Sequence, residues 1–200
     1  MLKTLRKPIR IGPGDHGRRM SLDRFDRATG QEGHLYELNK GVIEVVDVPD
    51  PTHGKQVQAL RNQFARYQDA HPGAIDFVGG SGEAKILLSS DQSERHPDLS
   101  VYLRAQPQGK NVWAAWVPEI VIEVVSPRSV KRDYEDKPAE YLDFGVREYW
   151  IVDPMKQQMT AMVRHAGRWE TRVVKPPQKY STYLLPGFTL NLKRVLSAAN

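Results

Sequence analysis

The chain has 200 residues, of which 40% are hydrophobic, and this is enough to build one domain with an ordinary core. It contains no cysteine, which excludes disulfides and thiolate metal sites and removes any need for an oxidising compartment. The N-terminus lacks the apolar run of a signal peptide, and no uncharged stretch approaches the roughly 20 residues that span a bilayer. A cytoplasmic protein without a membrane partner is therefore expected.

The net charge of +5 and the sequence pI of about 9.4 are compatible with a polyanionic partner, although dispersed surface lysines and arginines explain them equally well. Residues 1–19 are rich in basic side chains, proline and glycine and show no apolar period. We predict a flexible basic arm there, either solvated or in contact with a phosphate backbone. A single domain is predicted over residues 20–196.

Hydrophobic periodicity predicts the elements that follow the arm. A short helix is expected after Ser21. Two strands within residues 34–46 are joined by a turn at Asn39-Lys40-Gly41, and a helix capped by Thr52 runs from about His53 to Ala70. Further strands are predicted over residues 74–78, 84–88, 97–103, 118–127, 148–153, 159–163 and 169–173, with helices over 129–144 and within 190–196. This order indicates an α/β fold, with a central sheet flanked by helices and a β-rich C-terminal flank.

The segment from Pro118 to Pro127 is a β-branched run that is typical of a strand buried on both faces. It nevertheless contains Glu123. Burying an unpaired carboxylate costs roughly several kcal/mol. Glu123 should therefore lie near a cation or a metal, be protonated, or sit at the open end of the sheet.

A second acidic residue, Asp98, begins another apolar strand just after Pro97. Two strands that each carry one carboxylate can present both groups to one hard cation, which suits Mg²⁺ chemistry on phosphates. The alternative is that Glu123 caps an edge strand and Asp98 merely opens a turn. The two acids together, in a basic protein, favour the metal site.

Asp133, Lys137 and Tyr141 are spaced four residues apart and share one face if their helix is continuous. The plain interpretation is an exposed Asp133–Lys137 pair that contributes only about 0.3 to 0.5 kcal/mol. Pro138 complicates the geometry, because it disfavours helical backbone at the residue before it and can start or kink the helix there.

These elements carry an ordered set of short motifs that resembles the Uma family of putative restriction endonucleases, in the PD-(D/E)XK nuclease superfamily. The motifs occur in the family's order over about residues 20–196. The ordered set indicates the family much more specifically than any single motif does. They are Y-E-L-x-x-G at 36–41, His53 at the start of a helix, P-D-L-S-V-Y at 97–102, I-E-V-V-S-P at 122–127, D-x-x-x-K-x-x-x-Y at 133–141, G-V-R-E-Y-W-I-V-D-P at 145–154 and L-P-G-F at 185–188.

The resemblance implies a restriction-endonuclease-like fold with a central mixed sheet, and a Mg²⁺-dependent endonuclease in which Mn²⁺ can substitute. Asp98 and Glu123 would be the catalytic acids and the metal ligands. The position two beyond Glu123 is Val125 rather than the superfamily's lysine. Lys137 is the expected replacement, Glu37 a further catalytic acid, and His53 a contact to phosphate or water.

The partner implied by the resemblance is nucleic acid, with double-stranded DNA expected ahead of RNA and a homodimer as a further option. Two other classes of protein stay open. One is a catalytically inactive nucleic-acid-binding protein with the same fold, which the missing lysine at position 125 would explain. The other is a structural or oligomer-forming protein, in which Asp98 and Glu123 are tolerated surface acids and bind no metal.

Overall fold

The computed structural model describes residues 8–46, 48 and 50–199, and the chain forms two compact units where one domain was predicted. Unit 1 contains Met1–Val48 and Ile86–Arg95, and unit 2 contains Pro49–Lys85 and His96–Asn200. Across the residues that the structure describes, no helix has both the length and the apolar character needed to cross a membrane.

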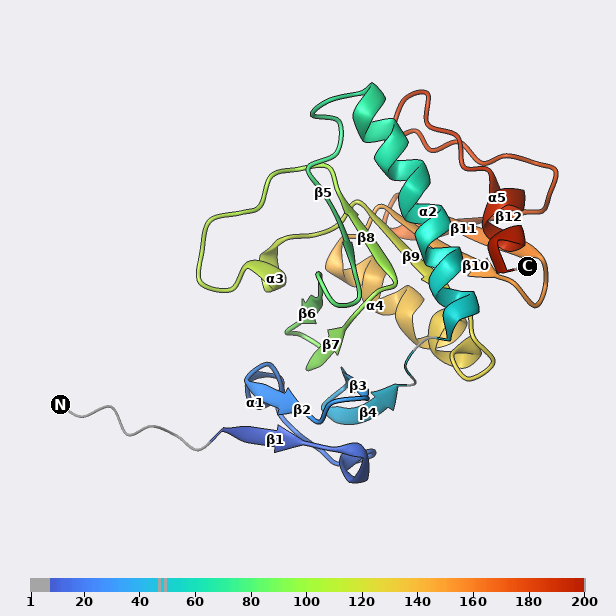
Figure 1. The fold of residues 1–200 in the computed structure, drawn as a ribbon. Coiled ribbons are helices and arrows are strands. Elements are labelled where there is room, and N and C mark those ends of the chain that lie inside the picture. Colours follow the sequence, from blue (N-terminus) through green and yellow to red (C-terminus); the bar gives the residue numbers. More distant parts are fainter. Residues whose placement is uncertain (1–7, 47, 49, 200) are drawn as a thin grey trace. The chain divides into compact units, whose positions relative to one another are not determined.

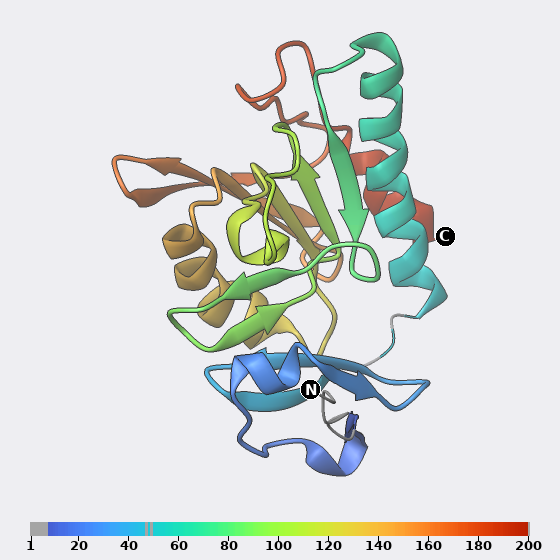
Figure 2. The ribbon, with the colours of Figure 1, turned by 90° about the vertical axis from the view of Figure 1, so that its left-hand side faces the viewer.

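Unit 1 is built mainly from short strands (Figure 2). Two of them pair in parallel, and four others form a sheet in the order β4-β3-β7-β6. The elements are β1 (Ile9–Ile11), the 3₁₀ turn η1 (Pro13–Asp15), α1 (Leu22–Phe25), β2 (Ala28–Gly30), β3 (Leu35–Asn39), β4 (Val42–Val46), β6 (Ile86–Leu88) and β7 (Ser93–Arg95).

The predicted basic arm requires a correction. Residues 1–7 lie outside the described part of the chain, whereas β1 and η1 give residues 9–15 regular structure. Ile11 is 4% exposed, and β1 pairs with β2. Burial of Ile11 and the ladder with β2 stabilise this segment, so the prediction of a flexible arm is wrong over residues 9–15.

The predicted hairpin of β3 and β4 is confirmed. Asn39 faces Val42, and the two residues between them, Lys40 and Gly41, have φ angles of 48° and 75°. Two consecutive positive φ values are the geometry of the two-residue turn that matches the twist of paired strands. The turn sequence therefore sets the register of this hairpin.

Unit 2 contains a six-stranded sheet in the order β12-β11-β10-β9-β8-β5 (Figure 1). β9 is parallel to β10, and every other neighbouring pair is antiparallel. The strands are β5 (Phe77–Gly80), β8 (Leu99–Tyr102), β9 (Ile120–Val124), β10 (Glu148–Asp153), β11 (Gln158–His165) and β12 (Arg168–Val174). The predicted α/β fold with a central mixed sheet flanked by helices is confirmed.

The helices of unit 2 cover both faces of this sheet. They are α2 (Pro51–Ala70), α3 (Val112–Ala115), α4 (Lys137–Phe144) and α5 (Leu192–Leu196), followed by the 3₁₀ turn η3 (Ser197–Ala199). Ile122 and Val124 belong to the hydrophobic core that includes residues of α2 and α5. Because side chains alternate along a strand, Glu123 points to the other face, where α4 reaches it. Full burial of β9 follows, as its β-branched sequence predicts.

The N-cap residue of α2 is not the one that was predicted. Asp50, not Thr52, is the N-cap residue, and its carboxylate accepts a hydrogen bond of 2.8 Å from the backbone N–H of His53. Pro51 then occupies the first turn, where its missing N–H costs nothing. This cap holds His53 in the first turn of the helix.

Candidate active site

Asp98 and Glu123 lie next to each other on adjacent strands of unit 2. Asp98 immediately precedes β8, whose Leu99 faces Ile122 of β9. Asp98 Oδ2 accepts a hydrogen bond of 2.7 Å from the backbone N–H of Val124, and the backbone N–H of Asp98 lies 3.4 Å from Glu123 Oε2. The antiparallel ladder therefore brings together the two carboxylates that the sequence predicted to form a pair.

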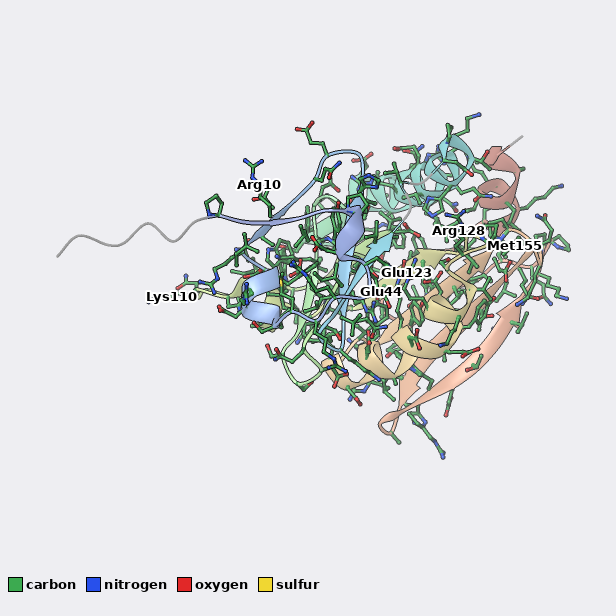
Figure 3. The ribbon with its side chains drawn as sticks, turned by 90° about the horizontal axis from the view of Figure 1, so that it is seen from below. Arg10, Glu44, Lys110, Glu123, Arg128 and Met155 are labelled. Carbon is green, nitrogen blue, oxygen red and sulfur yellow. The ribbon has the colours of Figure 1, made fainter. Side chains whose placement is uncertain are left out.

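Glu123, labelled in Figure 3, is only 4% exposed. Its carboxylate is bound on one side by two donors from the helical segment that follows β9. Lys137 Nζ and the hydroxyl of Tyr141 each donate to Glu123 Oε1 at 2.8 Å. An ammonium and a phenol thus satisfy a carboxylate that the hydrophobic strand would otherwise leave buried and unpaired.

Lys137 is itself 3% exposed and lies between two buried acids. Its ammonium is 3.1 Å from Asp133 Oδ1, an ion pair without the alignment of a good hydrogen bond. The interpretation of Asp133 and Lys137 as an exposed surface pair is therefore wrong. The four-residue spacing is instead used inside the protein, where charge interactions are screened much less than at the surface.

The helical segment before Lys137 widens into a π-turn over Arg132–Asp136. Pro138 has no N–H to donate to the carbonyl four residues earlier, and the N–H of Lys137 donates instead to the carbonyl of Arg132, five residues back. The hydroxyl of Tyr149 also donates to the carbonyl of Asp133 at 2.8 Å. Pro138 therefore alters the helix without turning Lys137 away from Glu123.

His53 lies beside Asp98. Its Nε2 is 3.1 Å from Asp98 Oδ2 and 3.1 Å from the carbonyl oxygen of Val124. A carbonyl can only accept, so Nε2 carries a proton, whereas the buried Nδ1 has no hydrogen-bond partner among the described residues. Desolvation lowers the pKa of His53, but the hydrogen bond to Asp98 and the charges of Asp98 and Glu123 outweigh it and raise the pKa overall.

Glu37, the further acid expected from the sequence, belongs to unit 1 and is 4% exposed. Its Oε2 lies 3.2 Å from Nη1 of Arg95, a fully buried guanidinium that also lies 3.4 Å from Glu44 Oε2. Within unit 1 this residue is therefore part of a buried charge network. A catalytic role for Glu37 stays a prediction.

The donor atoms of the site fit a hard divalent cation that keeps part of its water. Among the residues described here, no group of three or more histidine, cysteine, aspartate or glutamate side chains is arranged to hold a metal. Asp98 and Glu123 supply two carboxylates, and the carbonyl of Val124 is a third oxygen at the same strand ends. Mg²⁺ commonly takes one or two carboxylates, with waters and substrate phosphates completing its octahedron. Asp98 and Glu123 are therefore the residues that could hold such a cation, with water as the remaining ligands.

Two participants in the site were not identified as such from the sequence. Tyr141 was noted only as a member of the spaced set, yet it donates directly to Glu123. The carbonyl of Val124 is a backbone group, so the residue type at this position does not indicate that it takes part in the site. The spacing of Asp133, Lys137 and Tyr141 was the available signal for the first of these, because positions four apart meet on one helical face.

Comparisons with known proteins agree with this fold. The family model Uma2, described as "Putative restriction endonuclease", matches residues 22–193, which confirms the resemblance seen in the sequence. The crystal structure of a putative nuclease belonging to DUF820 from Anabaena variabilis ATCC 29413 has a TM-score of 0.73 and 19% sequence identity, and the match covers 90% of this chain and 99% of that one. At this identity the likeness establishes the fold alone. No curated protein matches the sequence.

The balance of effects on His53 leads to a test of its contact with Asp98. In Asp98→Asn the raising influence of the Asp98 carboxylate is lost while desolvation remains, so we expect the pKa of His53 to be lower than in wild type. An NMR titration of the imidazole in the presence of a chelator measures this. Asp76→Asn, at an exposed position, is the matched control and should leave the pKa of His53 unchanged. An equal pKa in wild type and Asp98→Asn would show that the carboxylate does not act on His53.

The burial of Lys137 predicts a large loss of stability on its removal. Lys137→Met withdraws an ammonium from two buried carboxylates, Glu123 and Asp133, and should lower the free energy of unfolding by about 3 kcal/mol. Lys131→Met, at an exposed position of the same segment, should change it by less than about 0.5 kcal/mol. Urea unfolding compares the two variants. Equal losses of stability in the two variants would show that Lys137 behaves as an exposed lysine.

Proposed function

Because the chain belongs to the Uma2 family, described as "Putative restriction endonuclease", we propose that it is a metal-dependent endonuclease that hydrolyses phosphodiester bonds in double-stranded DNA. The observation that carries the proposal is the pairing of Asp98 with Glu123 at the ends of two neighbouring strands, with the ammonium of Lys137 2.8 Å from Glu123. Two carboxylates can hold a metal ion for phosphodiester hydrolysis, and a lysine can stabilise the charge that develops on the phosphate.

Asp98 and Glu123 are the residues that would hold the cation, through oxygen atoms that select Mg²⁺, or Mn²⁺ in its place, over softer metals. When bound, such an ion polarises the scissile phosphate and lowers the pKa of a coordinated water. The protein's part is to fix the two carboxylates. The backbone N–H of Val124 and that of Asp98 do this through bonds to the opposite carboxylates.

Lys137 is proposed to take the role of the lysine that position 125 lacks. The backbone N–H of Val125 donates to the carbonyl of Val152 at 2.8 Å, so this residue continues the pairing of β9 with β10. Lys137 reaches Glu123 from the following helix instead. Its positive charge can orient the attacking water or stabilise the negative charge that develops on the phosphate in the transition state.

His53 is proposed to contact the phosphate or the water that attacks it. Its protonated Nε2 lies between Asp98 Oδ2 and the carbonyl of Val124, and its raised pKa favours the cationic form. A cation at this position would attract the phosphate backbone without taking part in base recognition. His53 thus complements the two carboxylates, which repel an anionic substrate when no metal is bound.

Affinity for DNA is proposed to come from the basic surface. Arg128 and Lys131 are both exposed on the segment that follows β9 directly, and Arg128 is labelled in Figure 3. Phosphate contacts from such residues are independent of sequence and weaken as salt rises, because binding releases counterions. A cytoplasmic location stays a prediction.

Nicking of supercoiled plasmid DNA tests the proposed activity. Wild-type protein should nick the plasmid with Mg²⁺ or Mn²⁺ and not with EDTA. Asp98→Asn and Glu123→Gln should each reduce the rate at least about a hundredfold, since each removes a metal ligand. Asp76→Asn and Glu135→Gln make the same chemical changes at exposed positions and should cleave as wild type does.

The same assay separates the alternative of an inactive DNA-binding protein. Plasmid binding that is unaffected by EDTA, without nicking under any metal condition, would favour that alternative. Nicking that persists in EDTA, or in both Asp98→Asn and Glu123→Gln, would contradict the assignment of the site.

A further inference from the structure

The strand β12 forms one edge of the six-stranded sheet, and in the part of the chain that the structure describes no strand pairs with its outer side. It is seven residues long, and all of its side chains except Trp169 and Val174 are exposed. Figures 1 and 2 show the hairpin of β11 and β12, in orange, at the margin of unit 2. The outer backbone N–H and carbonyl groups of β12 are thus available for pairing with another strand.

β12 lacks several of the features that usually prevent such pairing, although Arg168, Glu170 and Arg172 are charged. It contains neither proline nor lysine, and its register with β11 runs without a bulge from His165–Arg168 to Met159–Val174. The opposite edge of the sheet, β5, is protected in an ordinary way, being four residues long and ending in Gly79 and Gly80. Edge strands of soluble proteins are normally prevented from pairing with other chains by short length, charge, proline or bulges.

We propose that β12 pairs antiparallel with β12 of a second copy of this chain, about a twofold axis through Thr171. In this register the full strand is used, since Arg168 faces Val174 of the second copy. Glu170 then faces Arg172 twice, once on each side of the axis, and Trp169 faces Val173 twice. A surface that meets itself across a twofold axis has to be self-complementary in this way.

The charge pattern selects this register over its neighbours. A shift of the axis to position 170 would place Glu170 opposite Glu170 and Arg168 opposite Arg172, which are like charges. A shift to position 172 would place Arg172 opposite itself. Opposite charges directly across an antiparallel pair stabilise it and like charges destabilise it. Only the axis at Thr171 pairs the whole strand with both acid–base pairs matched.

The two faces of the strand support the same arrangement. Trp169 is fixed by the hydrogen bond from its Nε1 to the carbonyl of Pro138 at 2.8 Å, whereas Val173 on the same face is 49% exposed. Pairing would cover Val173 with the tryptophan of the second copy. On the other face, Glu170 already accepts a hydrogen bond of 2.9 Å from His165 within the hairpin and keeps a second oxygen for Arg172. This inference is independent of nuclease activity.

Charge reversal at the two paired positions tests the dimer. Wild-type protein should sediment as a dimer in analytical ultracentrifugation. Glu170→Arg and Arg172→Glu each put like charges opposite one another twice and should raise the dimer dissociation constant at least about tenfold. A mixture of the two variants should recover the dimer, because each then faces the opposite charges of the other. Lys110→Glu, in the exposed loop before α3, changes the net charge as Arg172→Glu does and should dimerise like wild type.

Each remaining result would overturn the proposal. A wild-type protein that is monomeric at about 100 µM would contradict the proposed interface. A dimer held by pairing of one strand edge should be populated at that concentration. Unchanged dimerisation of the single variants would place the interface elsewhere. Weakened single variants without recovery in the mixture would contradict the register. Thermal melting of the single variants checks that they are folded, and recovery in the mixture would itself exclude misfolding as the cause of dissociation.

Discussion

The burial of Glu123 near the end of β9, a hydrophobic inner strand of the sheet, is the constraint on which the candidate site depends. β9 is covered on both faces, so this carboxylate cannot rely on water and needs partners from the protein. Lys137 and Tyr141 provide them from α4, and Asp98 provides a backbone N–H from the neighbouring strand. Loss of one member of such a buried pair typically costs about 3 to 5 kcal/mol. Stability and proposed catalysis therefore rest on the same atoms.

The connection between β9 and α4 shows how the backbone meets this constraint. The chain has to return from the sheet and present Lys137 to Glu123, and it does so through the π-turn over Arg132–Asp136, directly before α4. The hydroxyl of Tyr149, on β10, binds the carbonyl of Asp133 inside that turn. A π-turn is uncommon and frequently marks functional positions. Here it sets which side chains of the helical segment face the sheet.

Much of this arrangement could be predicted from the sequence, because hydrophobic pattern and residue spacing encode it locally. The β-branched run around Glu123 and the carboxylate of Asp98 indicated the site from the residues themselves, whereas Lys137 was assigned to it only through the family resemblance. Contacts between distant residues were beyond such patterns. No strand was predicted over residues 93–95, yet Arg95 ends β7 there and binds Glu37, 58 residues away in the chain. The carbonyl of Val124 carries no sequence signal at all.

The central claim is that Asp98 and Glu123 together form the binding site of one divalent cation. Titration of the protein with Mn²⁺, followed by the electron paramagnetic resonance signal of the free ion, measures this directly and without any substrate. The account predicts one Mn²⁺ bound per chain in wild type and in Glu135→Gln, with affinity at least about tenfold weaker in Glu123→Gln. Equal affinity in wild type and Glu123→Gln, or no binding by wild type, would contradict it.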